Sequence, residues 1–413
     1  MQNHAILHSD LNCFYASVET MLDPSLRGKA VAVCGCTEDR HGIVLAKSEL
    51  AKKAGVKTGM VNWEAKQRCR DLIIVPPQYD QYLKYSKLTQ AIYQRYTDMV
   101  EPFGMDECWL DVTGSRYVCG DARMIAENIR RSVKEELGLT VSIGVSFNKV
   151  FAKLGSDLKK PDAITEISPE SYKEKVWPLP CSDMIYCGPA TTKKLAQYGI
   201  HTIGDVAVCD PLFLKGLLGV NGLALWTYAN GRDHSRVMHK DFVSPVKSVG
   251  HGITCVSDLE NEEEVWKVIF ALSQDIGHRL RLHNLATRTV QVHVRGKDLF
   301  GSQYQCKLPL KTQLPSEIAA AAFRSFKERY PWNTKVRAVT VRAIELSPKD
   351  SAEQLTLFDN VQHRMAMEKV QDAVEEIRGR FGKSAITYAC LMGDLKMPTD
   401  GRDKVKMPGL MYQ

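Results

Sequence analysis

Residues 10–19 read DLNCFYASVE, and the apolar run AIL at residues 5–7 stands shortly before them. The apolar run predicts a buried β-strand and the residues after position 13 predict a helix, so Asp10 lies where a strand ends. A carboxylate beside a buried strand is costly unless it has a partner, although most acidic residues simply face water. Asp10 is therefore a candidate for a metal-binding or catalytic role.

A second acidic site lies in residues 102–111, PFGMDECWLD, about a hundred residues later. Neighbouring residues on a regular strand point to opposite faces, so Asp106 and Glu107 can share a metal only where the backbone turns, which Gly104 permits. Three carboxylates would then meet at one end of a sheet. Hard cations such as Mg²⁺ prefer oxygen ligands, and two of them roughly 3.5 to 4 Å apart stabilise both oxygens of a phosphoryl transfer. The pattern predicts polymerase-like chemistry.

The composition is that of an ordinary water-soluble protein. The chain has 413 residues, enough for roughly two to four domains, with 44% hydrophobic and 25% charged residues. Its net charge of +7 is compatible with a polyanionic partner. Its 12 cysteines include no C-x-x-C pair, which favours reduced thiols over zinc sites or disulfides. We recognise no signal peptide and no apolar run of the roughly 20 residues that span a bilayer, so we expect a cytoplasmic protein without a membrane partner.

Three stretches together resemble the Y-family translesion DNA polymerases of the bacterial polymerase IV and UmuC type. They are residues 10–19, residues 104–111 (GMDECWLD) and residues 142–157 (SIGVSFNKVFAKLGSD), the last followed by Lys160 and Pro161. The motifs come in the family's order and at about its spacing, and the likeness continues to about residue 360. The resemblance implies a DNA-directed DNA polymerase.

The same resemblance, together with the alternation of predicted strands and helices, indicates an α+β multidomain fold, a right-hand polymerase. The implied parts are a ferredoxin-like palm at residues 1–20 and 79–167, small fingers at residues 21–78, a helical thumb with a helix-hairpin-helix at residues 168–240, a βαββαβ little finger at residues 241–346, and a linker, clamp-binding peptide and tail at residues 347–413.

The resemblance also implies a magnesium site with two ions. The family residues that match Asp10 and Asp106 bridge both ions. Glu107 matches a ligand of the ion that activates the primer 3′-hydroxyl. The backbone carbonyl of Leu11 matches a ligand of the ion held by the triphosphate. The expected catalytic residues are thus Asp10, Asp106 and Glu107.

Other residues match the family's nucleotide-binding positions. Tyr15 matches the steric gate, whose ring occupies the space that a ribose 2′-hydroxyl would need; the alternative is a core aromatic. Cys13, Phe14 and Tyr15 start a helix whose N–H groups can meet phosphate oxygens. Lys160 matches a residue that contacts the phosphates of the incoming nucleotide.

The fingers depart from the family pattern. Where polymerase IV relatives commonly have Thr, Tyr and Arg near the triphosphate, this sequence has Ala46, Glu49 and Lys52. Lys52 can act as a point charge but lacks the bidentate geometry of arginine, and Glu49 would repel a phosphate. Either the nucleotide contacts are rearranged, as in a UmuC-like branch, or catalysis is weaker.

Residues 182–200 resemble a helix-hairpin-helix, in which a glycine turn offers backbone N–H groups to a DNA phosphate. Gly188 matches the first hairpin glycine, and Ala190 stands at the position of the second. Residues 217–222 are either a looser second copy or an ordinary helical hairpin.

In the little-finger-like region, apolar and polar residues alternate over residues 289–295, which predicts a strand with one core face and one polar face. Asp298 is the only acid between positions 288 and 311. A one-sided basic sheet fits binding to the DNA backbone. The basic residues assigned to this surface are Arg288, Arg295, Lys297, Lys307, Lys311 and Arg342.

Residues 353–359 read EQLTLFD, which is a weak signal alone, because short apolar runs usually belong to a core. Their place after the last predicted domain resembles the family's sliding-clamp peptide. The resemblance implies that the clamp (beta subunit) binds Gln354, Leu355, Leu357 and Phe358. Beyond this peptide we expect an amphipathic helix at residues 365–381 and a poorly structured end at residues 393–413, without an assigned role.

The expected activity is synthesis opposite damaged or distorted templates, with low fidelity and low processivity, by a monomer that binds primer-template DNA and dNTPs. Such an enzyme belongs to the mutagenic SOS response to DNA damage. One alternative is a catalytically weak or inactive clamp-bound DNA-binding subunit, but lost catalysis usually degrades the acidic residues, and all three are present. The other is a nucleotide cyclase on a similar palm, which would have no use for duplex-binding elements.

Overall fold

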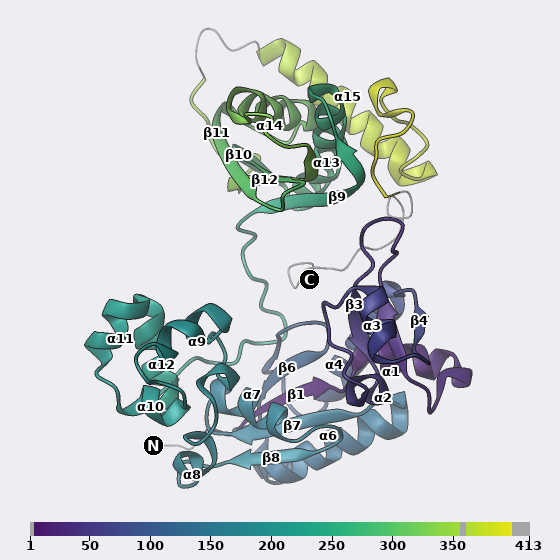
Figure 1. Cartoon of the computed structure of the whole chain (residues 1–413). Coiled ribbons are helices and arrows are strands. Elements are labelled where there is room, and N and C mark those ends of the chain that lie inside the picture. Colours follow the sequence, from purple (N-terminus) through teal and green to yellow (C-terminus); the bar gives the residue numbers. More distant parts are fainter. Residues whose placement is uncertain (1–3, 356–360, 399–413) are drawn as a thin grey trace. The chain divides into compact units, whose positions relative to one another are not determined.

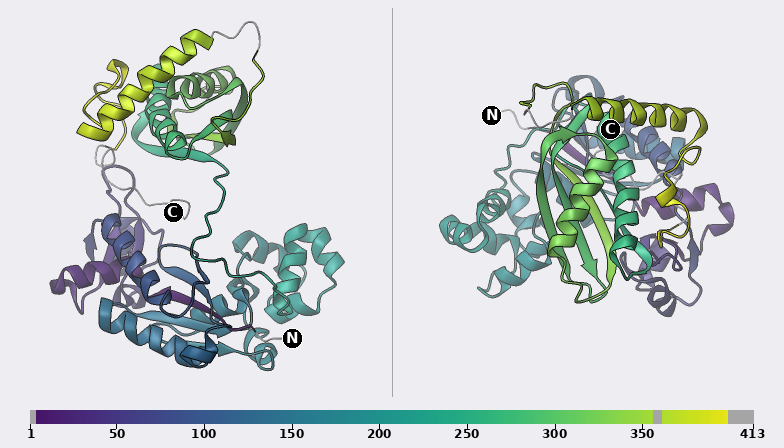
Figure 2. Two further views of the ribbon diagram at one scale, coloured as in Figure 1. Left: turned by 180° about the vertical axis from the view of Figure 1, so that it is seen from behind. Right: turned by 90° about the horizontal axis from the view of Figure 1, so that it is seen from above.

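The computed structural model describes residues 4–355 and 361–398 of the chain (Figures 1 and 2). These residues form two compact units, one made of residues 4–34 and 44–243 and the other of residues 35–43, 244–355 and 361–398. No helix in the described ranges is long and apolar enough to cross a membrane.

A five-stranded sheet with the order β5-β6-β1-β7-β8 forms the centre of the first unit (Figure 1). The strand β1 pairs antiparallel with both β6 and β7, whereas β7 and β8 are parallel. The apolar run that opens the sequence therefore becomes a central strand, buried along its whole length. The strands are β1 Ile6–Leu11, β5 Val100–Pro102, β6 Glu107–Asp111, β7 Val141–Ser146 and β8 Ile164–Ile167.

Helices cover both faces of this sheet. The α4 and α6 helices pack in one core with β1 and β7, and α7 packs against the opposite face. The contact with α7 is close, because a Cβ atom on Gly144 of β7 would lie 1.8 Å from the carbonyl oxygen of Ala152, so only glycine fits there. The helices are α1 Phe14–Leu22, α4 Tyr79–Tyr93, α5 Arg116–Cys119, α6 Ala122–Leu137 and α7 Lys149–Leu158.

A smaller sheet, ordered β3-β2-β4, lies in the sequence between α1 and α4 and has its own apolar core. The predicted fingers segment contains this sheet. Its elements are the 3-10 helix η1 Pro24–Leu26, β2 Val31–Cys34, β3 Val44–Lys47, α2 Glu49–Lys53, α3 Asn62–Arg68 and β4 Ile73–Val75.

Short helices follow β8 and share a core with the apolar stripe of α7, including Phe151 and Leu154. They lie in the segment predicted as the thumb. The elements are α8 Tyr172–Val176, η2 Cys181–Asp183, α9 Pro189–Ala196, α10 Ile203–Val208, α11 Pro211–Leu218 and α12 Val220–Ala229.

The second unit has the element order βαββαβ, which confirms the arrangement predicted for the little finger. Its sheet is ordered β11-β10-β12-β9, and α13 and α14 cover one face. Asn261 accepts a hydrogen bond from the N–H of Glu264 and caps α13. The elements are β9 Val249–Leu259, α13 Glu262–Leu282, β10 Leu285–Gly296, β11 Gly301–Thr312, α14 Pro315–Arg329 and β12 Val336–Pro348.

The C-terminal segment adds a further layer to this unit. The α15 helix, Val361–Phe381, packs against α13, with His278 Nδ1 2.5 Å from Glu375 Oε2. After the 3-10 helix η3, Ala389–Leu391, the side chain of Leu395 enters the apolar core. The expectation of a poorly structured end was therefore wrong for residues 393–398; residues 399–413 lie outside the described residues.

Candidate active site

Strand pairing brings the two acidic sites together. In the β1/β6 ladder Asp10 is the direct partner of Glu107, and the N–H of Leu11 donates to the carbonyl oxygen of Asp106 at 2.9 Å. Directly opposed residues on neighbouring strands have Cβ atoms about 4.5 to 5.5 Å apart. The three carboxylates thus share one end of the central sheet, as their sequence context predicts.

The hairpin between β5 and β6 turns the backbone at the second acidic site. Gly104 has φ of +142°, and the N–H of Phe103 donates to the carbonyl oxygen of Glu107 at 2.8 Å. A Cβ atom on Gly104 would lie 3.2 Å from Oδ1 of Asp106. The glycine therefore provides both the turn that the sequence predicts and the space that the Asp106 side chain occupies.

Lysine side chains contact two of these carboxylates. Lys160 Nζ lies 2.7 Å from Asp10 Oδ2, and Lys153 Nζ lies 2.6 Å from Glu107 Oε2. The fully buried His8, on β1, places Nε2 3.5 Å from the same oxygen of Glu107. Within the described residues, no three His, Cys, Asp or Glu side chains are already gathered as a metal site. A cation bound here would have to replace the lysine contacts.

The electrostatics of the cluster follow from burial and from the mutual repulsion of the acids. Burial raises the pKa of Asp10 to about 7 even though Lys160 opposes the rise, and burial and Glu107 raise the pKa of Asp106. Burial would also raise the pKa of Glu107, but contacts with His8 and Lys153 outweigh it and lower that pKa. Crowded, partly desolvated carboxylates of this kind favour a divalent cation, so the donor set fits a hard metal ion.

Sequence reasoning missed His8 and the contact made by Lys153. The histidine lies inside the apolar β1 strand and donates to or accepts from Ser156 Oγ at 2.8 Å, so its sequence context resembles that of a core residue. Lys149, one turn before Lys153, instead pairs with Glu101 at 2.7 Å and lies over the ring of Trp109. Lys149 and Lys153 lie one helical turn apart, and their spacing in the sequence does not indicate which acid each of them contacts.

Tyr15 packs beside the carboxylates. Its ring stacks on Tyr82 at a centroid distance of 4.1 Å, and its hydroxyl lies 3.5 Å from Met105 Sδ. Burial and the Asp106 carboxylate raise the pKa of Tyr15 to about 12. The side chain is only half-buried, so it is packed by aromatic neighbours yet retains an exposed part.

The start of α1 contacts the fingers segment. Cys13 has φ of +48° and donates its thiol to Glu49 Oε1 at 3.1 Å, while Phe14 is buried in the core. Glu49 also lies 3.7 Å from Lys52 Nζ. The acid that the sequence predicts to repel a phosphate therefore has two partners here. Ala46 and Lys47 end β3 nearby, and Lys47 donates to Thr58 Oγ1 at 3.0 Å.

The hairpin candidates begin helices at glycine. Gly188 is the N-cap of α9, in which Ala190 occupies the first turn, and Gly219 with φ of +67° is the N-cap of α12. A glycine N-cap has no side chain that could cover the first N–H groups of the helix. The two sites share a glycine N-cap but differ in backbone conformation, because Gly188 is extended with φ of −73° and Gly219 has a positive φ.

Within the second unit, the predicted basic residues do not form a uniform set. Arg295, Lys307 and Arg342 are exposed and belong to strand positions that alternate with core residues, on the sheet face opposite α13 and α14. Arg288 and Lys297 are exposed as well. Lys311 is half-buried and donates to the carbonyl oxygen of Pro348 at 3.2 Å, which ties it to the linker.

The clamp-peptide prediction falls only partly within the described residues. Gln354 is exposed and Leu355 is 47% exposed, whereas Leu357 and Phe358 lie outside them. All twelve cysteines lie in the described ranges and are free thiols, as their spacing indicates.

Comparisons with known proteins agree along nearly the whole chain. The impB/mucB/samB family matches residues 9–157, and the C-terminal domain of the same family matches residues 246–357. The DNA polymerase IV of Acetivibrio thermocellus is 48% identical over 94% of this chain and 98% of its own length. The DNA polymerase IV 1 of Bacillus subtilis is 35% identical over 97% of this chain and 96% of its own length.

A solved Y-family DNA polymerase chimera of Dbh and Dpo4 has the same fold, with a TM-score of 0.73 and 22% identity, over 83% of this chain and 98% of the chimera. This match confirms the predicted multidomain α+β fold. The inactive-subunit and cyclase alternatives are not favoured by these relatives. The chain therefore belongs to the impB/mucB/samB family and is a Y-family translesion DNA polymerase of the DNA polymerase IV type.

Proposed function

We propose that this polymerase inserts deoxynucleotides opposite damaged or distorted templates by nucleotidyl transfer at a site with two Mg²⁺ ions. The observation that carries the proposal is the direct pairing of Asp10 with Glu107, with Asp106 at the adjoining turn. The predicted division into palm, fingers, thumb, little finger and tail is part of the same proposal.

Asp10, Asp106, Glu107 and the carbonyl oxygen of Leu11 would hold the metal ions. When bound, the ions would lower the pKa of the primer 3′-hydroxyl and stabilise negative charge on the triphosphate. The chain's own contribution is to bury the carboxylates, so that they have few competing water contacts, and to keep lysines within reach. Lys160 and Lys153 neutralise Asp10 and Glu107 until the metal and nucleotide arrive.

The nucleotide would lie against the start of α1. The N–H groups that follow Cys13 would meet phosphate oxygens there, and Lys52 and Lys160 would neutralise the triphosphate. Tyr15, held in place by its stacking on Tyr82, would exclude the ribose 2′-hydroxyl. Lys47, which lies near Glu49 and Lys52, is a further cation in this region.

DNA would bind through phosphate contacts. Gly188 and the residues around Ala190 would offer backbone N–H groups, and the exposed arginines and lysines of the little-finger sheet would neutralise the backbone without reading the bases. The enzyme would act as a monomer in the cytoplasm and bind the sliding clamp through Gln354, Leu355, Leu357 and Phe358. A tethered clamp would compensate for a small DNA contact surface and low processivity.

Primer extension tests this function. We expect the purified protein to extend a primer on an intact template and past an abasic site when Mg²⁺ is supplied, to stop when EDTA removes the metal, and to resume when Mg²⁺ is restored. Failure to extend any template with Mg²⁺, at protein concentrations that bind the DNA, would instead favour the inactive DNA-binding subunit.

A further inference from the structure

The segment that carries Lys160 connects α7 to β8. Lys160 Nζ lies 2.7 Å from Asp10 Oδ2 and 2.9 Å from Asp157 Oδ1. A lysine has a flexible stem and a large rotamer entropy, so its ammonium group stays at one place only when the backbone beneath it is fixed. The position of Lys160 therefore depends on what holds this connection.

Asp162, two residues later, is held from three directions. Arg130 Nη1 donates to Asp162 Oδ1 at 2.7 Å, and Lys134 Nζ donates to Oδ2 at 2.7 Å. The backbone N–H of Asp162 donates to Oδ1 of Asn12 at 2.9 Å. The two cations are one turn apart on α6, so a single helix face presents both to the carboxylate.

Asn12 connects this brace to the carboxylate end of β1. It is buried, two residues after Asp10, and its Nδ2 donates to Ser142 Oγ at 2.9 Å. Its side-chain amide thus uses one end for β7 and the other for Asp162. The same residue links the sheet that carries Asp10 to the segment that carries Lys160.

The backbone at Asp162 needs such support. Its φ of +53° lies in the left-handed region, which costs a residue other than glycine free energy and persists when surrounding contacts over-determine it. Burial would raise the pKa of Asp162, but the hydrogen bonds from Lys134 and Arg130 outweigh burial and lower that pKa. The carboxylate is therefore charged when it binds its two cations.

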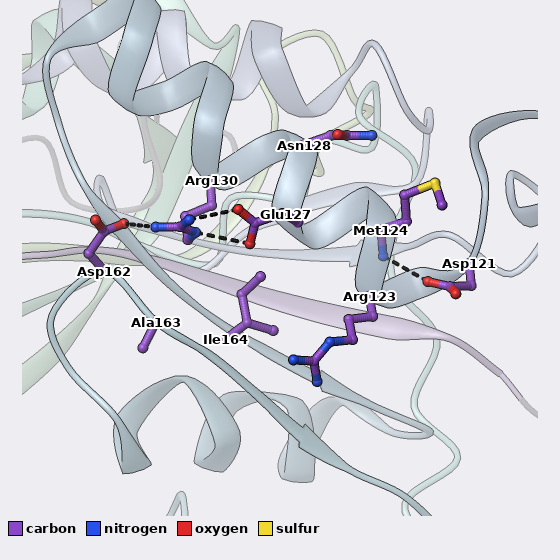
Figure 3. A pocket seen from close by; sticks show the side chains of 9 residues that line it. All are labelled: Asp121, Arg123, Met124, Glu127, Asn128, Arg130, Asp162, Ala163 and Ile164. Carbon is purple, nitrogen blue, oxygen red and sulfur yellow. Dashed lines mark hydrogen bonds and ion pairs between the residues drawn. The ribbon is translucent and has the colours of Figure 1, made fainter.

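A surface pocket lies beside the brace, with Arg130 between Glu127 and Asp162 in its wall (Figure 3). Glu127 Oε1 accepts from Arg130 Nη2 at 2.6 Å, so both ends of the guanidinium already contact carboxylates. A ligand would have to compete with two acids for this arginine. The arrangement fits a structural brace better than a binding site.

We propose that Asp162, held by Arg130, Lys134 and Asn12, is a positioning residue that places Lys160 at the nucleotide phosphates. The inference rests on the proposed function, because it assigns Lys160 to the triphosphate. It adds a role for Arg130 and Lys134 of α6, which lie outside the sequence motifs around the carboxylates.

A double-mutant cycle tests the proposal. Asp162→Asn keeps the shape and tolerates a positive φ but removes the charge that binds Arg130 and Lys134. We expect Asp162→Asn and Arg130→Ala to raise the KM for dNTP several-fold, up to roughly tenfold, with a smaller change in kcat and an unchanged Kd for primer-template DNA. In a Lys160→Ala background neither substitution should raise KM further. Arg131→Ala, the next residue on α6, is the matched control and should leave KM unchanged.

Equal KM increases with and without Lys160 would overturn the proposal, because they would show that Asp162 acts through the general stability of the palm. So would a wild-type KM in both single variants. Melting temperatures of all variants, measured alongside, separate an unfolded variant from a misplaced lysine. Absence of wild-type activity would refute the proposed function itself, since the cycle requires a measurable KM.

Discussion

Tyr15 packs in an aromatic cluster and yet keeps part of its side chain exposed. Its ring contacts Tyr82 and Tyr79, yet the residue is only half-buried. Because stacking on one side fixes the ring, it cannot move aside for a group that would overlap it on the other side. A rigid ring is what discrimination between two sugars requires.

We predict that Tyr15→Ala raises ribonucleotide incorporation relative to deoxyribonucleotide incorporation, because the clash with a 2′-hydroxyl is lost. Comparing kcat/KM for the two sugars in wild type and variant measures the effect. An unchanged ratio would return Tyr15 to a purely structural role, and a lowered melting temperature with that ratio would support the packing explanation.

Glu49 is the residue whose sequence interpretation the structure changes most. It contacts Cys13 and Lys52, so its charge is partly compensated. We predict that Glu49→Gln lowers the KM for dNTP roughly two- to fivefold, because the neutral side chain no longer competes with the triphosphate for Lys52. This factor is the usual contribution of a solvent-accessible ion pair. Glu64→Gln, which removes an acid of α3 that lies 4.0 Å from Arg68, should leave KM unchanged. A higher KM in Glu49→Gln would mean that the acid itself orders the nucleotide site.

At the residue scale, sequence and structure agree best for acidic residues that lie next to apolar strands. Asp10 and Asp106 could be singled out because carboxylates rarely follow apolar strands without a reason. His8 and Asp162 could not, because their partners lie 148 and 32 residues away and no local pattern marks them. Contacts of that range become visible only once the strands are paired.

At the scale of elements, the βαββαβ unit was predictable because its strands alternate with period two and its long helix repeats apolar residues at helical spacing. The packing of the C-terminal segment against this unit was not predictable from the sequence. Leu391 and Leu395 are buried in the core of this unit but belong to a 3-10 turn and an irregular stretch, which have no periodicity.

We predict that Leu395→Ala destabilises the second unit by roughly 2 to 5 kcal/mol, the usual cost of truncating a buried leucine. Met392→Ala is the matched control, because Met392 is 70% exposed and only three residues away. Thermal or urea unfolding of the two variants measures the difference. Equal stabilities would show that the segment after α15 packs only loosely.

At the scale of the whole molecule, residues before and after the proposed clamp peptide contact the same residue, Lys311. Oε1 of Glu353 accepts from the N–H of Lys311 at 2.6 Å, and the guanidinium of Arg364 donates to the carbonyl oxygen of Lys311. Glu353 and Arg364, on either side of residues 356–360, are thus both attached to β11. The sequence alone predicts a linker here and does not reveal either contact.

We predict that replacing Gln354, Leu357 and Phe358 with alanine leaves synthesis on short templates unchanged and removes stimulation by the cognate sliding clamp. Burying Leu357 and Phe358 in an apolar clamp pocket would contribute roughly 1.5 to 3 kcal/mol each. Titration of the clamp against both proteins measures the loss. Equal binding would refute the assignment, and a lowered melting temperature would favour packing against the little finger.

The central claim is that Asp10, Asp106 and Glu107 perform the chemistry while other parts of the chain bind DNA. Asp106→Asn tests it most directly, because the change removes one ligand charge and almost no volume. We predict that single-nucleotide incorporation with Mg²⁺ is abolished, since transition-state stabilisation of several kcal/mol is lost, while the Kd for primer-template DNA stays near that of wild type. Asp98→Asn, an exposed acid that pairs with Lys240, should retain full activity. Incorporation by Asp106→Asn at close to the wild-type rate would contradict the account.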